Sequence, residues 1–116
     1  SGDDLPMVAA DTPMRDAIYE MSRKGLGITA VVADGQLLGC ISDGDLRRLL
    51  QTDDQLLKRT AGECMRTGPR SIGPEELASV ALKAMEDFRI TSLFVCEGEH
   101  LLGIVHLHDL WRLELF

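Results

Sequence analysis

Aromatic and basic residues are the two scarce classes in this sequence. Only five of its 116 residues are aromatic, and 12 lysines and arginines face 19 aspartates and glutamates, which leaves a net charge of −7. Proteins that bind nucleic acid need a basic surface and often stack bases on aromatic rings. The composition therefore argues against a nucleic-acid partner. It remains compatible with a small anionic ligand, which needs only a local cluster of arginine or lysine.

Long apolar runs and paired cysteines are also missing. No apolar stretch approaches the roughly 20 residues that cross a bilayer, and no signal-peptide pattern is present, so we expect no membrane association. Cys40, Cys64 and Cys96 are odd in number and form no C-x-x-C motif. We expect free thiols, with Cys40 and Cys96 buried, in a reducing and therefore cytoplasmic compartment. The start at Ser1, without an initiator methionine, predicts a piece of a longer protein.

What the sequence does contain is an internal repeat. The stretch GCISDGDLRRLL (39–50) returns as GIVHLHDLWRLEL (103–115), which places Asp45 on Asp109 at an offset of 64 residues. With 45% hydrophobic residues, the chain can bury a modest core. Two copies are too few for a solenoid, so we predict two repeats that face each other about a pseudo-twofold axis. The predicted repeats are residues 1–60 and 61–116.

The first strands of the two copies align at a different offset from the C-terminal ends of the copies. Ile28 and Thr29 match Ile90 and Thr91 at an offset of 62 residues rather than 64. Because insertions are tolerated best in loops, this alignment predicts two extra residues after the first helix and two in the second hairpin.

Each copy is predicted to contain a helix, two strands and a second helix, which makes an α+β (α/β-like) fold. Apolar residues recur at helical spacing in the helices, and the strands lie between glycine-containing turns. In the first copy we expect a helix capped by Thr12 with Pro13 at its first position, strands 28–33 and 36–41 around an Asp34-Gly35 turn, and a helix from just after Ser42 to about residue 51. In the second copy we expect a helix opened by residues 74–76, strands 90–96 and 101–106, and a helix over 107–115.

The segment from Ser42 to Arg48 has the chemistry that a ribonucleotide requires. A strand ends there and a helix begins, and the N–H groups at a helix start favour a phosphate. Ser42 can donate to a phosphate oxygen, and the two oxygens of Asp45 can accept both hydroxyls of a ribose cis-diol. Arg47 and Arg48 supply positive charge. The alternative interpretation is that Ser42 and Asp45 only cap the helix and complement its dipole.

These patterns resemble a CBS domain pair, also called a Bateman module, over almost the whole chain. The resemblance rests on the P-M-x-x-A helix start, the I-T-x-V strand, the L-L-G-x-h return strand and Ser42-x-x-Asp45, followed by a second copy in register. It implies that Ser42 and Asp45 hold ribose and phosphate. It also implies that Thr29 and Thr91 face a ligand cleft between the repeats.

The second copy carries His106-Leu107-His108-Asp109 where the first carries Ser42 to Asp45. Asp109 keeps the position that accepts a ribose diol, whereas His106, with His108 near it, can donate to a phosphate or a carboxylate. The two half-sites are therefore predicted to differ, unless His106 only fills space at the sheet edge. Two histidines and an aspartate in one run fit no usual zinc spacing, so we expect no metal. The remaining candidate ligand contacts are Val8, Ile28, Ile72 and Ile90, which can sandwich a base, and Arg23, Lys24 and Arg89, each of which is an anion partner or a solvated surface charge.

A narrower resemblance concerns the ends of the two copies. SDGDLRR and HLHDL are similar to the signatures that close the two copies in the C-terminal CBS pair of bacterial D-arabinose 5-phosphate isomerases. This implies an N-terminal sugar-isomerase domain in the parent protein, and no isomerase activity or cofactor in this chain itself. The implied pathway makes the sugar acid Kdo for lipopolysaccharide. CMP-Kdo, which is both a nucleotide and an acid, is therefore expected as effector ahead of AMP or ATP.

Three hypotheses remain open from the sequence. In the first, a nucleotide or nucleotide-sugar between the repeats shifts them against each other and biases the attached isomerase domain. In the second, the pair only associates into a homodimer, through the apolar residues Met21, Leu49, Leu110 and Trp111. In the third, Asp43, Asp45 and the two histidines perform acid–base catalysis, although no nucleophile–base pair accompanies them.

Overall fold

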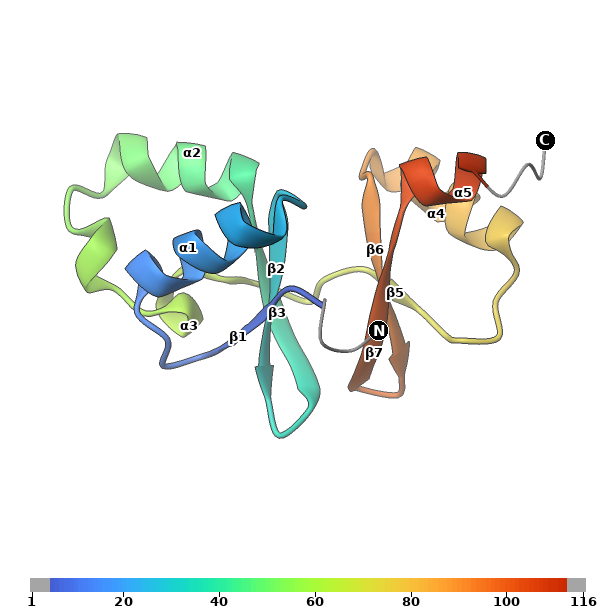
Figure 1. Cartoon of the computed structure of the whole chain (residues 1–116), viewed down its shortest axis with the longest axis horizontal. Coiled ribbons are helices and arrows are strands. Elements are labelled where there is room, and N and C mark those ends of the chain that lie inside the picture. The colour runs from blue at the N-terminus through green and yellow to red at the C-terminus, as the bar shows by residue number, and fades with distance from the viewer. Residues whose placement is uncertain (1–4, 113–116) are drawn as a thin grey trace. The chain divides into compact units, whose positions relative to one another are not determined.

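The computed structural model describes residues 5–112 and divides the chain into two compact units, with Pro69 in the first and Arg70 in the second. Figure 1 shows the elements of both units. Residues 61–69, which the predicted boundary assigns to the second repeat, belong to the first unit. Within residues 5–112, no helix has the length and apolar character that crossing a bilayer requires.

The first unit is a small sheet with helices against it. In this sheet β1 (Met7–Ala9) is parallel to β2 (Ile28–Ala33), β2 is antiparallel to β3 (Gln36–Ser42), and β3 is antiparallel to β4 (Arg66–Thr67). The helices are α1 (Met14–Lys24), α2 (Asp43–Thr52), the 3-10 helix η2 (Leu56–Lys58) and α3 (Ala61–Cys64). The predicted strand 28–33 is confirmed as β2. The predicted turn is confirmed too, because Asp34 and Gly35 have φ of 52° and 78°, a region that aspartate and glycine tolerate.

The core of the first unit lies between its helices and the sheet. Met14, Ala17 and Met21 recur on one side of α1, and all three are buried against Val31 of β2 and Ile41 of β3. Met21 is only 3% exposed. Its prediction as part of an association surface is therefore wrong. Met21 lies at helical spacing from Met14 and Ala17, so it faces the core with them.

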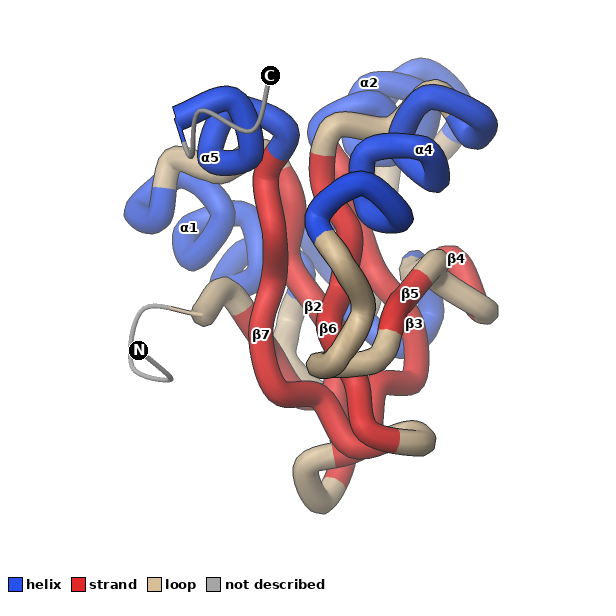
Figure 2. Tube along the Cα trace, turned by 90° about the vertical axis from the view of Figure 1, so that its right-hand side faces the viewer, coloured by secondary structure: helices blue, strands red, loops and turns tan. Residues whose placement is uncertain are grey.

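The second unit repeats this plan with fewer elements. In it β5 (Ser71–Ile72) is parallel to β6 (Ser92–Glu97), and β6 is antiparallel to β7 (His100–His106). The helices α4 (Ala78–Phe88) and α5 (Leu107–Arg112) contact β6 and β7 respectively (Figure 2). Leu110 is 4% exposed and forms a core with Ala81, Met85 and Leu93, so its prediction as a surface residue is also wrong. The side chain of Trp111 and the predicted helix beyond residue 112 lie outside the described residues.

A single offset of 64 residues relates the strands and helices of the two units. Helices α1 and α4 each contain 11 residues. Val31 pairs with Gly39 and Val95 pairs with Gly103, and each hairpin has its register shift directly after this pair. The predicted insertions are therefore wrong. The two hairpins have equal lengths, and so do the two segments between the first helix and the first strand.

The corrected register separates Thr29 from Thr91. Thr29 lies inside β2, whereas Thr91 lies in the loop before β6, outside the strand predicted from residue 90. Thr91 corresponds instead to Gly27, since the N–H of Leu107 donates to the Thr91 carbonyl at 2.9 Å as the N–H of Asp43 does to the Gly27 carbonyl. The repeated Ile-Thr pair misled the alignment because a two-residue match carries little information about register.

Both first helices begin later than predicted. The Thr12 hydroxyl accepts the N–H of Ala9 at 3.1 Å and does not cap α1, whose N-cap position is Pro13. Helix α4 begins at Ala78 rather than at residues 74–76. The preceding residues form a separate turn, in which the N–H of Glu76 donates to the Gly73 carbonyl at 3.3 Å.

The thiols behave as their apolar sequence surroundings predict. Cys40 and Cys96 are buried, Cys64 is partly buried, and all three are unpaired. Burial raises the pKa of both Cys40 and Cys96 above the usual thiol range, so both remain protonated at neutral pH.

Candidate functional site

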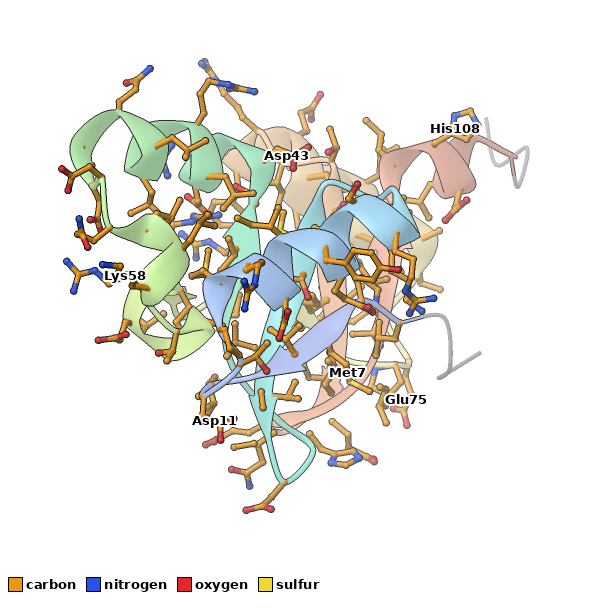
Figure 3. All side chains as sticks on the ribbon, turned by 60° about the vertical axis from the view of Figure 1, so that its left-hand side comes forward. Met7, Asp11, Asp43, Lys58, Glu75 and His108 are labelled. Carbon is orange, nitrogen blue, oxygen red and sulfur yellow. The ribbon has the colours of Figure 1, made fainter. Side chains whose placement is uncertain are left out.

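The junction of β3 and α2 forms a capping box around Ser42 and Asp45. Ser42 is the N-cap residue, with extended backbone at φ −111° and ψ 168°. Its Oγ accepts the N–H of Asp45 at 3.2 Å, and Oδ2 of Asp45 accepts the N–H of Ser42 at 2.9 Å. Ser42 and Asp45 therefore do cap the helix, and ligand contact at these two residues stays a prediction. Figure 3 labels Asp43, the first residue of this helix.

Two arginines contact the carboxylate of Asp45, which is only 4% exposed. Nη2 of Arg48, one turn further along α2, donates to Oδ1. Nε of Arg66 on β4 lies 3.0 Å from each of the two carboxylate oxygens. The side chains of Arg48 and Arg66 remain 67% and 58% exposed. Such partners are needed because a buried carboxylate without a counter-ion is costly.

The electrostatics keep Asp45 ionised at neutral pH. Burial on its own raises the pKa of this carboxyl, but the hydrogen bonds from the Ser42 N–H and from Arg66 outweigh it, so the pKa lies below its usual value. The same ion pair raises the pKa of Arg66. Asp45 is therefore a pure hydrogen-bond acceptor, which suits the two hydroxyls of a ribose.

The other predicted residues of the first copy lie in different environments. Ile28 is the cross-strand partner of Ser42 and therefore lies beside it. Thr29 is fully buried and its hydroxyl donates to the Ala30 carbonyl at 3.2 Å. Arg47 is exposed on α2. Within the described residues, Asp45 forms its ion pairs with Arg48 and Arg66.

The second copy has a histidine where the first has Ser42. His106 ends β7 opposite Ser92 of β6, and its Nδ1 lies 2.7 Å from the Ser92 Oγ. Nε2 of His106 is buried and, among the described residues, has no hydrogen-bond partner. Because an unpaired buried polar atom costs free energy, this nitrogen calls for an explanation.

The remaining predicted residues of the second copy are spread along the chain. His108 and Asp109 are exposed on α5, and Figure 3 shows His108 on the outer side of that helix. Arg89 ends α4 with left-handed backbone and is exposed, whereas Ile90 packs on the core and Thr91 is exposed. Among the described residues no three His, Cys, Asp or Glu side chains lie close enough to hold a metal ion.

Sequence reasoning missed two residues of this arrangement, Arg66 and Ser92. Arg66 lies 21 residues beyond Asp45, in a strand of two residues, which is too short to show a periodic pattern in the sequence. Ser92 was recoverable, because a uniform offset of 64 places it on Ile28, the cross-strand partner of Ser42. A gap-free alignment places Ser92 on Ile28 and His106 on Ser42, and so predicts that Ser92 and His106 are cross-strand partners.

Comparison with known proteins decides the family. The profile of the CBS domain matches residues 2–52 and 61–110. The chain belongs to the CBS domain family. An arabinose 5-phosphate isomerase from Francisella tularensis is 44% identical over 115 residues, which cover 98% of this chain and 35% of that protein. This CBS pair thus spans about a third of the length of its curated relative.

Solved structures show the same fold. A CBS-domain protein from Agrobacterium tumefaciens matches 96% of this chain and 84% of its own, with a TM-score of 0.82 at 19% identity. A CBS domain protein from Pyrobaculum aerophilum, complexed with AMP, matches 90% of this chain and 82% of its own, with a TM-score of 0.79 at 17% identity.

Proposed function

We propose that this CBS pair is the regulatory part of an arabinose 5-phosphate isomerase and that it binds a nucleotide effector at Ser42 and Asp45. The observation that carries the proposal is an ionised, buried carboxylate at the start of α2, held by two largely exposed arginines. The 44% identity to an isomerase of that specificity supports the parent enzyme. The AMP complex of a protein with the same fold supports the class of ligand.

The geometry suits a ribonucleotide in a specific way. The two ribose hydroxyls replace the exposed arginine side chains on the Asp45 oxygens, and Ser42, whose Oγ already accepts a hydrogen bond, still has its O–H to donate. The phosphate lies near the N-terminal N–H groups of α2, where the helix dipole favours an anion.

Calorimetric titration of the chain with CMP-Kdo, AMP and ATP tests this proposal. At least one of the three should bind, and Asp45→Ala should weaken that ligand about tenfold or more, because a hydrogen bond to a charged group contributes about 1.5–3 kcal/mol. Asp54→Ala, which removes an exposed aspartate from the same unit, is the control and should leave the affinity unchanged. Absence of heat with all three ligands at millimolar concentration would refute the proposal.

We further propose CMP-Kdo as the preferred effector, with His106 meeting its acid group. If Ser92 donates to Nδ1, then Nε2 carries the proton and can donate to a carboxylate. The unpartnered state of Nε2 supports a role beyond packing. His106→Ala should therefore weaken CMP-Kdo more than AMP. Equal weakening of both ligands would identify His106 as a packing residue.

A second candidate function, self-association, is favoured by one surface. Leu77, Val80 and Phe88 line one side of α4 and are 70%, 42% and 46% exposed. The corresponding positions on α1 are Pro13, Asp16 and Lys24, so this apolar stripe is specific to the second copy. Sedimentation of the chain decides: a nucleotide-independent dimer that Val80→Lys dissociates would favour association as the main role.

A further inference from the structure

The surroundings of Asp45 hold more positive charge than one carboxylate needs. Arg48 and Arg66 both donate to it. When the exposed neighbours Asp43 and Arg47 are included, three arginines stand against two aspartates, in a chain whose net charge is −7. A local excess of positive charge on an acidic protein attracts an anion.

Arg66 combines a fixed backbone with a movable side chain. Its backbone pairs with Cys40 of β3, and its carbonyl oxygen lies so close to Gly39 that a Cβ there would be 2.5 Å away. The side chain is 58% exposed. Besides its contact with Asp45, it makes one long polar contact within the described residues, 3.9 Å from Nη2 to Sγ of Cys40. The guanidinium can therefore turn to a neighbouring anion without moving the sheet.

We propose that Arg66 binds the phosphate of the ligand whose ribose binds Asp45. The ribose hydroxyls then donate to the carboxylate oxygens, so Asp45 keeps hydrogen-bond donors, and the released guanidinium of Arg66 passes to the phosphate, which gives it a new anionic partner. This inference rests on the proposed nucleotide-binding function and extends it, since it makes the site selective for phosphorylated nucleosides over nucleosides.

Titration of the wild type and Arg66→Gln with AMP and CMP, and with adenosine and cytidine, tests the inference. Arg66→Gln should weaken the nucleotides at least tenfold, whereas the nucleosides should not be weakened, because Arg66 competes with their hydroxyls for Asp45 and offers them no contact. Arg59→Gln is the matched control: it also removes one partly exposed guanidinium and one ion pair, with Asp53, and should leave all affinities unchanged.

The possible results separate the two proposals. If nucleotides and nucleosides weaken equally, or if AMP and CMP bind as before, Arg66 does not bind phosphate, although the site itself stands. If the wild type binds none of the four compounds, the site and the role of Arg66 fall together. Thermal unfolding checks whether Arg66→Gln is folded. If it is not, Arg66→Lys, which keeps the charge and loses the planar fork, must show the same selective loss in smaller measure.

Discussion

At the scale of single residues, Asp45 has two roles that use the same atoms. Its carboxylate closes the capping box with Ser42 and forms ion pairs with Arg48 and Arg66. The sequence left capping and ligand binding as alternatives, but the geometry makes them compatible, because the backbone N–H of Ser42 uses one lone pair and the arginines can be exchanged. A residue of this kind affects stability even when no ligand is present.

Asp45→Asn should lower the free energy of unfolding by about 1–3 kcal/mol at pH 7, because it removes the charge while keeping an acceptor oxygen. The pKa of Asp45 is lowered in the folded protein. Its contribution is therefore complete above the unfolded carboxyl pKa of about 4 and is lost as the pH falls through the lower folded value. Urea unfolding at several pH values between 7 and 3 should show the difference between wild type and variant shrinking below about pH 4.

The exposed Asp54 gives the control for this measurement, since Asp54→Asn should change the unfolding free energy little at any pH. A difference between wild type and Asp45→Asn that stays constant down to pH 3 would contradict the ion-pair account of Asp45.

Arg89 is a second residue that affects stability locally, through backbone strain. It ends α4 with φ 55°, at the position where the first copy has Gly25 with φ 67°. Because glycine adopts this conformation without strain, Arg89→Gly should raise the free energy of unfolding by about 0.5–1 kcal/mol in thermal or urea unfolding. The reverse change, Gly25→Arg, should lower it. A loss of stability in Arg89→Gly would show that the arginine side chain makes a contact that outweighs the strain.

At the scale of elements, the sequence predicts what is local and misses what is not. Strand β2, its turn and helix α2 follow from residues adjacent in the chain: the β-branched run, Asp34-Gly35 and Ser42. The β1, β4 and β5 strands are two or three residues long and depend on partners elsewhere, so no pattern indicates them. For the same reason the sequence did not predict the contact of Arg66 with Asp45. It did predict Ser42 and Asp45, because these two residues lie close together in the chain.

The approach of β4 to β3 explains why position 39 is a glycine, but it does not apply to the equivalent Gly103. A Cβ on Gly39 would lie 2.5 Å from the Arg66 carbonyl oxygen and 2.7 Å from Sδ of Met65, whereas one on Gly103 would meet nothing within 4 Å. Gly39→Ala should therefore cost about 1–3 kcal/mol in urea unfolding, as overpacking does, and should disturb the placement of Arg66. Gly103→Ala is the matched control and should be nearly neutral. Equal effects of the two changes would argue against the close approach.

At the scale of the whole molecule, the two copies share a frame but differ in chemistry. One offset relates their helices and strands, yet the first copy has Ser42, Arg48 and a partner in Arg66, while the second has His106 and Ser92. Repetition therefore fixes the scaffold, and substitutions within it give equivalent positions of the two copies different chemistry.

The most direct test of the central claim, nucleotide binding at Asp45, is a crystal structure of the chain grown with AMP or CMP-Kdo at saturating concentration. The account predicts a ribose whose two hydroxyls lie within hydrogen-bond distance, about 2.5–3.0 Å, of the Asp45 carboxylate oxygens, with Arg66 turned to the phosphate. A structure in which Asp45 still holds both Arg48 and Arg66, with the nucleotide elsewhere or absent, would contradict it.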